Sequence, residues 1–202
     1  MIGPNPSVSI INWNARHIKN KKTELKKFIS DLKLPEILCI QETRLKKNDT
    51  FKIHKYEEFR QPESENKSPG LSILVREDIN ANLIEEKESI CINYQTLEIS
   101  INKVKFQLSN VYLRDPNHNT SKAELTTLLD KKNHIFVGDF NAHSKSWGNN
   151  TEDSTGKHIE EITLDTKSTV INTGLPTRLG NIHQSNTAID LAVVTEKFPY
   201  PI

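Results

Sequence analysis

Residues 135–141 read Ile-Phe-Val-Gly-Asp-Phe-Asn, an apolar run that ends abruptly in a carboxylate and a carboxamide. The run predicts a buried strand. Because successive strand side chains point to opposite faces, Asp139 and Asn141 are expected to project together from the end of this strand. The alternative is a strand followed by an ordinary Asp/Asn-rich turn, which Gly138 and Asn141 would also suit. This stretch alone does not separate a functional site from a turn.

The composition is that of an ordinary globular chain. Its 202 residues contain no internal repeat or low-complexity tract, which favours a single domain over residues 1–202. The formal net charge is +1, so any footprint for nucleic acid would have to be local. Local basic stretches occur at Lys19, Lys21, Lys22, Lys26 and Lys27, and at Arg44, Lys46 and Lys47. Charge runs of this kind are more often solvated faces than binding sites.

The two cysteines, Cys39 and Cys91, form neither a disulfide framework nor a metal-ligand spacing. Cys39 lies in an apolar run and is predicted to be a small buried hydrophobe, which favours a reducing compartment. The first residues lack the basic and apolar regions of a signal peptide, and no stretch approaches transmembrane length. We therefore expect a soluble intracellular protein that does not associate with membranes. The sequence predicts no oligomeric state.

Predicted helices and strands are interleaved along the chain. Helical spacing of apolar residues predicts one helix over about 18–32, stopped before Pro35, a second after the capping-box pattern at 121–124, and a third over 156–166. Strands are predicted over 8–14, 37–40, 70–75, 135–140, 169–172 and 188–194. Strict alternation on both sides of Asn102-Lys103 predicts a hairpin. Because a hairpin requires antiparallel pairing, the pattern favours a mixed α+β arrangement of packed sheets.

Several predicted strands end in polar residues that their apolar patterns do not explain. These residues are Asn14, Glu42, Tyr112, and the pair Asp139 and Asn141. Asp190 lies inside the apolar run 188–194 and requires a partner, because an aspartate is rarely buried unpaired. Each residue alone has an ordinary explanation, such as an edge tyrosine with its hydroxyl in water. Together they predict one polar site at the strand ends.

Six segments, in this order, resemble the endonuclease/exonuclease/phosphatase superfamily. They are Asn12-Trp13-Asn14, Gln41-Glu42-Thr43, Pro69-Gly70-Leu71-Ser72-Ile73, Asn110-Val111-Tyr112, Gly138-Asp139-Phe140-Asn141-Ala142-His143 and Ala188-Ile189-Asp190-Leu191. Asn141-Ala142-His143 followed by Trp147-Gly148 is similar to the apurinic-type endonuclease domain of retrotransposons that lack long terminal repeats, which nicks target DNA. The resemblance covers essentially the whole chain. It implies a four-layered α/β sandwich of two packed mixed sheets flanked by helices.

The resemblance also implies a metal and a nucleophile. Glu42 would hold a catalytic Mg²⁺ or Mn²⁺, a hard cation that takes carboxylate oxygens and keeps several waters. Asn14 would lie beside this ion as a further ligand or catalytic group. Asp139 would orient and deprotonate the attacking water. These roles suit an in-line displacement at a phosphodiester, which needs an oriented nucleophile and charge neutralisation.

Other residues would bind the phosphate by the same resemblance. Asn141 would hold a phosphate oxygen, and Tyr112 would steady the phosphate as negative charge builds. Thr177 would donate to the same group. His143 and Arg114 are further candidate substrate-binding residues. The implied partner of all of them is DNA.

One part of the superfamily pattern has no match in this chain. The pattern ends in Ser-Asp-His on a last strand, and its histidine contacts the scissile phosphate. After Asp190 the sequence runs only to Ile202, without another strand pattern. Asp190 would normally orient that histidine. We therefore expect a domain truncated at its C-terminus that lacks the last strand, exposes a sheet edge and is impaired as a nuclease.

The sequence leaves three functions open. The first is a metal-dependent DNA endonuclease domain of a retrotransposon-type protein, which would act in the nucleus. The second is a noncatalytic nucleic-acid-binding or structural remnant with the same fold. The third keeps the chemistry on a substrate other than DNA. Target specificity would depend on loops whose shape the sequence does not predict.

Overall fold

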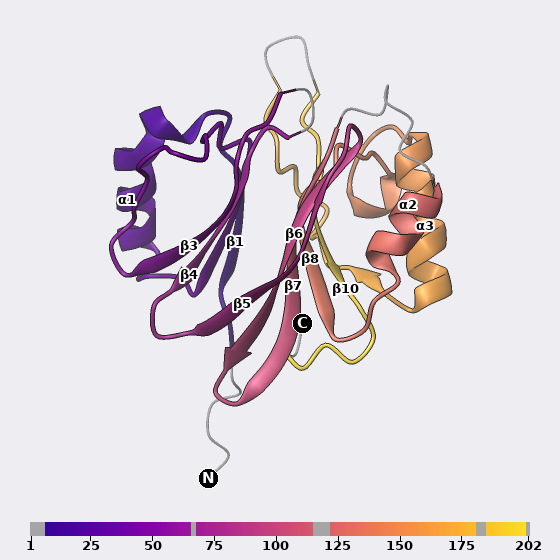
Figure 1. The fold of residues 1–202 in the computed structure, drawn as a ribbon. Coiled ribbons are helices and arrows are strands. Elements are labelled where there is room, and N and C mark those ends of the chain that lie inside the picture. Colours follow the sequence, from indigo (N-terminus) through magenta and orange to yellow (C-terminus); the bar gives the residue numbers. More distant parts are fainter. Residues whose placement is uncertain (1–6, 66–67, 115–121, 181–184, 201–202) are drawn as a thin grey trace.

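The computed structural model describes residues 7–65, 68–114, 122–180 and 185–200. Two β-sheets pack face to face, with helix α1 (Lys22–Asp31) outside one sheet and helices α2 (Lys122–Leu129) and α3 (Ser154–Thr166) outside the other (Figure 1). Short 3-10 helices η1 (Ile18–Lys21) and η3 (Lys145–Trp147) lie in the connections. This four-layered α+β sandwich confirms the predicted fold class. None of the described helices is long and apolar enough to cross a membrane.

The smaller sheet has four strands in the order β1-β2-β4-β3. Its strands are β1 (Ile10–Asn14), β2 (Ile37–Gln41), β3 (Tyr56–Gln61) and β4 (Leu71–Arg76). The pair β1 and β2 is parallel and the other pairs are antiparallel, so the sheet is mixed. Parallel pairing brings Asn14 into register with Gln41 at one end of the sheet. Among the described strands β1 pairs with β2 alone, and the missing last strand stays a prediction.

The larger sheet has six strands in the order β5-β6-β7-β8-β10-β9. They are β5 (Asn80–Glu88), β6 (Ile92–Ile101), β7 (Val104–Leu113), β8 (His134–Asp139), β10 (Asp190–Val194) and β9 (Thr169–Val170). Tyr112, Asp139 and Asp190 are successive register partners on β7, β8 and β10. Partners in register share a face of the sheet, so the three side chains lie on the same side.

The predicted hairpin is confirmed by β6 and β7, which pair from Ile101–Val104 to Ile92–Leu113. Asn102 and Lys103 both have positive φ, 51° and 68°, as a tight two-residue turn requires. The capping-box serine, Ser121, lies outside the described residues, although helix α2 forms directly after it. The apolar residues Leu125, Leu128 and Leu129 of that helix are buried.

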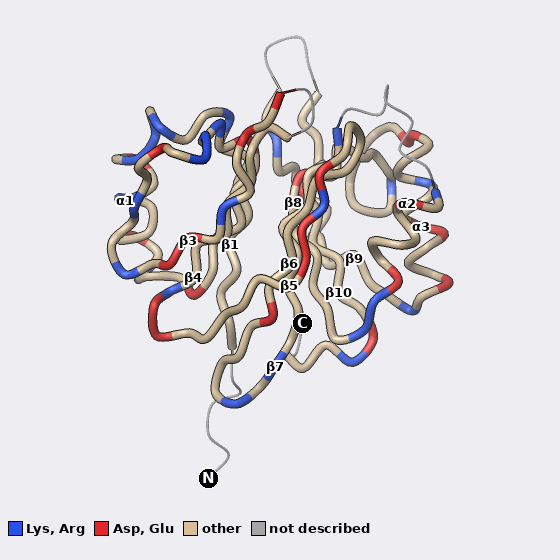
Figure 2. The backbone as a smooth tube through the Cα atoms, viewed as in Figure 1, with Lys and Arg blue, Asp and Glu red and all other residues tan. Residues whose placement is uncertain are grey.

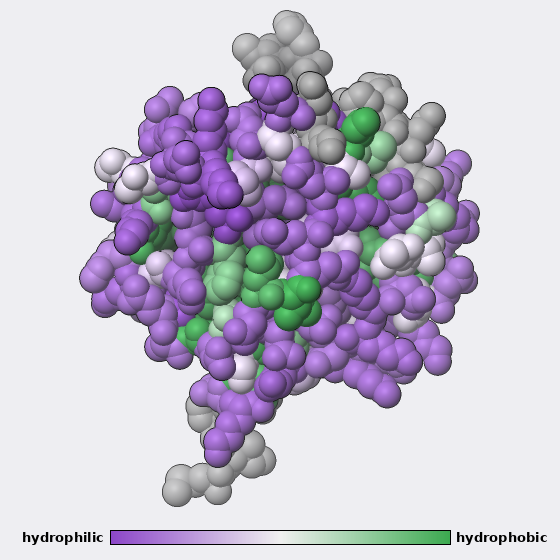
Figure 3. Space-filling view, in the orientation of Figure 1, coloured by the Kyte–Doolittle hydropathy of each residue, from purple (hydrophilic) through white to green (hydrophobic). Residues whose placement is uncertain are grey.

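Two strands, β3 and β5, were not predicted. Both are edge strands of their sheets, and their sequences are mostly polar because one edge and much of their surface face solvent. On β5, Leu83 and Ile84 are 45% and 48% exposed. Figure 3 shows a green patch near the centre of an otherwise hydrophilic face.

Three apolar clusters hold the layers together. One fills the space between the sheets, one lies under α2 and α3, and one lies under α1. Cys39 is fully buried between the sheets, as predicted, and burial raises the pKa of its thiol. The polar residues that end the strands, among them Asn14, Tyr112 and Asp139, lie outside these clusters.

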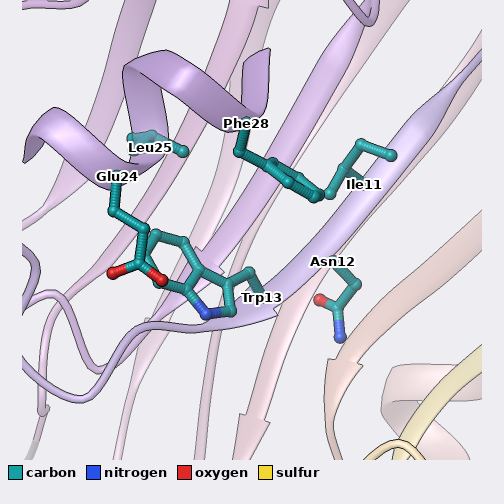
Figure 4. Close-up of a pocket in the computed structure, with 6 residues that line it drawn as sticks. All are labelled: Ile11, Asn12, Trp13, Glu24, Leu25 and Phe28. Carbon is teal, nitrogen blue, oxygen red and sulfur yellow. The ribbon is translucent and has the colours of Figure 1, made fainter. Parts of the chain in front are cut away.

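The predicted apolar face of helix α1 is only partly buried. Leu25 and Ile29 face the sheet, but Phe28 and Leu32 are each 43% exposed. Phe28 lies over the outer edge of β1, where a cavity of about 190 Å³ separates it from Trp13 (Figure 4). The helical spacing was read correctly, but it could not show that the flank of the helix has no described strand beneath it.

Candidate active site

Asn14, at the end of β1, joins carboxylates that belong to the two different sheets. Its Nδ2 donates to Glu42 Oε1 at 2.9 Å and to Asp139 Oδ2 at 2.8 Å. Its Oδ1 accepts the backbone N–H of Arg16 at 3.2 Å, which determines the orientation of the amide. Three residues predicted from separate strand ends therefore meet at one point.

The loop that carries Glu42 is held on both sides by backbone hydrogen bonds. The N–H of His17 donates to Glu42 O at 2.8 Å, and the N–H of Thr43 donates to Gly70 O at 3.0 Å. Glu42 itself has a φ of 49°, an uncommon conformation for a residue with a side chain. A Cβ at Gly70 would lie 2.5 Å from Thr43 Oγ1, so the Pro69-Gly70 pair keeps the glycine that this turn needs.

Asn141 reaches the site by a turn and not along a strand. Strand β8 ends at Asp139, and Asn141 has a φ of 43°. Asp139 Oδ1 accepts the N–H of Asn141 at 3.0 Å, and Asn141 Nδ2 donates to Leu113 O at 2.8 Å. The prediction that Asp139 and Asn141 share a strand face was therefore wrong, because the strand ends at Asp139. The Asp/Asn-rich turn, offered as the alternative, is itself what positions these two side chains.

Burial and repulsion control the charge of the site. Asp139 is 5% exposed, and burial, followed by the charge of Asp190, raises its pKa to about 7. Burial also raises the pKa of Asp190, against a hydrogen bond from Thr177. The pKa of Tyr112 is raised, first by burial and then by Glu42 and Asp139, so its hydroxyl keeps its proton. A buried carboxyl that titrates near neutral pH is typical of catalytic groups.

A cavity of about 290 Å³ opens directly onto these groups. Its lining includes Asn14, Asp139, Thr177 and Asp190. The hydroxyl oxygen of Thr177 accepts the N–H groups of Ile189 at 3.2 Å and Asp190 at 3.1 Å. Predicted residues from β1, β8, β10 and the segment before β10 thus share one cavity.

Arginines surround this acidic centre. Arg16 and Arg178 line the cavity and oppose the raised pKa of Asp190. Arg114, one of the predicted residues, and Arg44 act in the same direction on Tyr112. Arg16 and Arg178 were not predicted, although each stands within two residues of a predicted one. The resulting positive field is local, and the net charge of +1, a sum over the whole sequence, does not indicate it.

The longer basic stretches lie elsewhere. Lysines gather on helix α1 and the segments beside it (Figure 2). Lys19 pairs with Asp49 at 2.7 Å, and Lys21 donates to Ala15 O at 2.6 Å. These partners suit the solvated-face interpretation of the N-terminal lysines.

His143 does not line the cavity. Its Nδ1 lies 2.9 Å from Asp153 Oδ2, which also accepts the His143 N–H at 3.0 Å. Asp153 Oδ1 in turn accepts the N–H of Gly156 at 2.7 Å and so caps helix α3. These contacts tie the loop after Asn141 to the start of α3.

A metal at this site would have few protein ligands. Within the described ranges no three His, Cys, Asp or Glu side chains lie close enough to hold one ion between them. Glu42 and Asp139, joined by Asn14, offer two carboxylates. Mg²⁺ is commonly bound by one or two carboxylates and several waters, so this donor set fits it. Asn14 directs Nδ2, a group that cannot ligate a cation, toward both carboxylates.

Comparisons with known proteins bear on the family of the chain. A family model described as Endonuclease-reverse transcriptase matches residues 106–199. The probable RNA-directed DNA polymerase from transposon BS of Drosophila melanogaster is 26% identical over 192 residues, which is 92% of this chain. The chain spans only 21% of that relative's length.

Solved structures share the fold. The endonuclease domain of TRAS1, a telomere-specific non-LTR retrotransposon, superposes with a TM-score of 0.74 and 18% identity over 95% of this chain and 86% of that one. TDP2 of D. rerio, complexed with single strand DNA product, gives a TM-score of 0.64 and 15% identity over 96% and 86%. The shared fold, the family model and the relatives together support a domain of the endonuclease/exonuclease/phosphatase superfamily, similar to retrotransposon endonucleases.

Proposed function

We propose that this domain is a metal-dependent endonuclease that nicks DNA by hydrolysing a phosphodiester bond, as part of a retrotransposon-type protein acting in the nucleus. The proposal rests mainly on the Asn14 amide, which donates to both Glu42 and Asp139. The cavity beside it is lined by Arg16 and Arg178. The likeness to a retrotransposon endonuclease domain and to a DNA-bound enzyme supports DNA as the partner.

Asp139 is suited to act as the general base. Each of its oxygens accepts one N–H, from Asn14 and from Asn141, so the carboxylate cannot rotate freely. A water bound to it would therefore be aimed in one direction. Its pKa of about 7 lets it accept a proton near neutral pH, where general bases are most effective.

The groups around the cavity are suited to hold a phosphate. Arg16 and Arg178 supply positive charge at the cavity. Tyr112, the register partner of Asp139, remains protonated and can donate as negative charge develops. Thr177 accepts two backbone N–H groups through its oxygen and donates its hydroxyl proton to the Asp190 carboxylate, which holds this carboxylate at the cavity. Preorganised donors of this kind contribute much of the stabilisation of a transition state.

Glu42 would hold the divalent cation, with its carboxylate oriented by Asn14. Mg²⁺ or Mn²⁺, when bound, supplies positive charge that stabilises the oxygens of a displacement at phosphorus. The charge of Glu42 adds to the raised pKa of the buried Asp139, so these two carboxylates are a donor set that a dication would stabilise.

A nicking assay tests the proposal. Supercoiled plasmid should become open-circular in Mg²⁺ and not in EDTA. Asp139→Asn should slow nicking about 10²- to 10⁴-fold, as loss of a general base does. The exposed Asp130→Asn makes the same chemical change away from the cavity and should leave the rate unchanged. A parent that retards DNA in a gel but never nicks it would refute the endonuclease and favour the noncatalytic alternative.

A further inference from the structure

Three amides form a hydrogen-bonded chain between the two sheets, next to the candidate site. Asn110 on β7 and Gln41 on β2 are fully buried. Gln41 Nε2 donates to Asn110 Oδ1 at 2.6 Å and to Asn12 Oδ1 at 2.7 Å. Asn12 Nδ2 then lies 3.4 Å from Asp190 Oδ1. The chain therefore starts on the larger sheet, crosses the smaller one and returns to the larger sheet at Asp190.

Backbone groups determine the direction of the Asn110 amide, and the other two amides follow from it. Asn110 Nδ2 donates to Ile40 O and Ser72 O, both at 3.1 Å, so its Oδ1 must be the acceptor that faces Gln41. Gln41 Nε2 has two hydrogens, and the second goes to Asn12 Oδ1. Asn12 is thereby forced to turn Nδ2 toward β10. A flipped Asn12 would place two acceptors, its own oxygen and the Asp190 carboxylate, against each other.

The Asp190 carboxylate has hydrogen bonds from Thr177 and, across the sheets, from Asn12. Asn172 Nδ2 donates to Asp190 O at 2.8 Å, and Thr177 accepts the Asp190 N–H at 3.1 Å, so the strand is held by other residues. Asn12 approaches the carboxylate from the opposite sheet. Figure 4 shows Asn12 on the side of β1 away from Trp13 and helix α1. Asn12 and Asp190 also line one cavity of about 380 Å³.

We propose that Asn12 and Gln41 are positioning residues that hold the Asp190 carboxylate beside Asp139 and the cavity arginines. This inference rests on the proposed function. Asp190 is the register partner of Asp139 and shares its cavity with Arg16 and Arg178. Displacing its charge would therefore disturb the general base and the phosphate-binding groups together. Misplacements of about 1 Å in such sites can cost about 10²-fold in rate.

A double-mutant cycle on nicking tests whether Asn12 acts through Asp190. Asn12→Leu keeps the size of the side chain and removes the donor, and should lower kcat about 10- to 100-fold with KM changed less than about twofold. In an Asp190→Ala background the same change should have no further effect on kcat, because its target is gone. Gln41→Leu should show the same dependence on Asp190, since it removes the bond that orients Asn12.

Asn172→Leu is the matched control. It removes amide hydrogen bonds to Asp190 O and Ala192 N, but none to the carboxylate. Its effect on kcat should be the same in both backgrounds. Equal losses from Asn12→Leu in both backgrounds, or an unchanged kcat in the parent background, would overturn the inference.

Folding and function are separated by two further measurements. Thermal unfolding by circular dichroism identifies a variant that has not folded. Should Asn12→Leu fail, Asn12→Asp keeps the acceptor for Gln41 and replaces the donor with a carboxylate that repels Asp190, so its kcat should fall at least as far. A parent that does not nick refutes the proposed function and this inference with it. An active parent with equal losses in both backgrounds refutes the inference alone.

Discussion

Replacing Asp139 with asparagine is expected to remove the stability cost of a buried charge along with the general base. Burial and the charge of Asp190 raise the pKa of Asp139 from 3.8 to about 7. A carboxyl with a higher pKa in the folded state binds its proton more tightly there. The free energy of unfolding should therefore decline as the pH rises from about 4 to about 7, and should not depend on this group outside that window.

The size of the effect follows from the shift. One pKa unit corresponds to about 1.4 kcal/mol, and about two units of this window lie between pH 5 and pH 8. Over that range the free energy of unfolding of the parent should fall about 2–3 kcal/mol further than that of Asp139→Asn. The asparagine Nδ2 would face an N–H donor, of Asn14 or of Asn141, at a cost of about 1–3 kcal/mol. That cost does not depend on pH, so the difference in slope isolates the charge.

Urea denaturation of both proteins in EDTA at several pH values measures this slope. Asp130→Asn should follow the parent curve, because Asp130 is exposed. Adding Mg²⁺ should reduce the difference between parent and Asp139→Asn, since a bound dication stabilises the ionised carboxylate. Parallel curves for the parent and Asp139→Asn in EDTA would refute the argument that burial and Asp190 raise this pKa.

Three further outcomes are expected. Glu42→Ala should weaken Mg²⁺ or Mn²⁺ binding in a calorimetric titration without lowering Tm, and equal affinities in the two proteins would exclude Glu42 as the ligand. Tyr112→Phe removes a hydroxyl that stays protonated, and steady-state nicking should slow about 10²- to 10³-fold at an unchanged Tm; an unchanged rate would exclude the hydroxyl from the reaction. Gly138→Ala should lower the free energy of unfolding in denaturation by more than about 4 kcal/mol, because a Cβ there would lie 1.9 Å from Val111 O. A loss below about 1 kcal/mol would show that β7 and β8 can separate to make room for it.

Much of the architecture follows from local pattern. The alternation around Asn102-Lys103 predicted β6 and β7, and the short apolar runs predicted β2, β4 and β8. These elements are buried, so the pattern of their apolar side chains indicates which face packs against the core. Strands β3 and β5 have no such apolar pattern, because they lie at sheet edges. The resemblance over six segments predicted that two sheets pack together, which periodicity alone does not predict.

The residue types of the candidate site were also visible in the sequence. Asn14, Glu42, Tyr112 and Asp139 stood out because polar groups end apolar strands, and the structure brings them together. The same argument misjudged Asn141, whose turn geometry interrupts the strand. His143, taken as substrate-binding, is held by Asp153 outside the cavity.

Only the tertiary structure decided which of these residues hydrogen-bond to one another and how they shift one another's pKa. Asn14 and Asp139 are 125 positions apart, and Asn12 and Asp190 are 178 apart, yet each pair is joined by a hydrogen bond. The pKa of Asp139 near 7 arises from burial between two sheets and from a neighbour on another strand. Local sequence determines which side chains end a strand. Which amide faces which carboxylate, and which carboxyl keeps its proton, depends on distances that exist only after the sheets have packed.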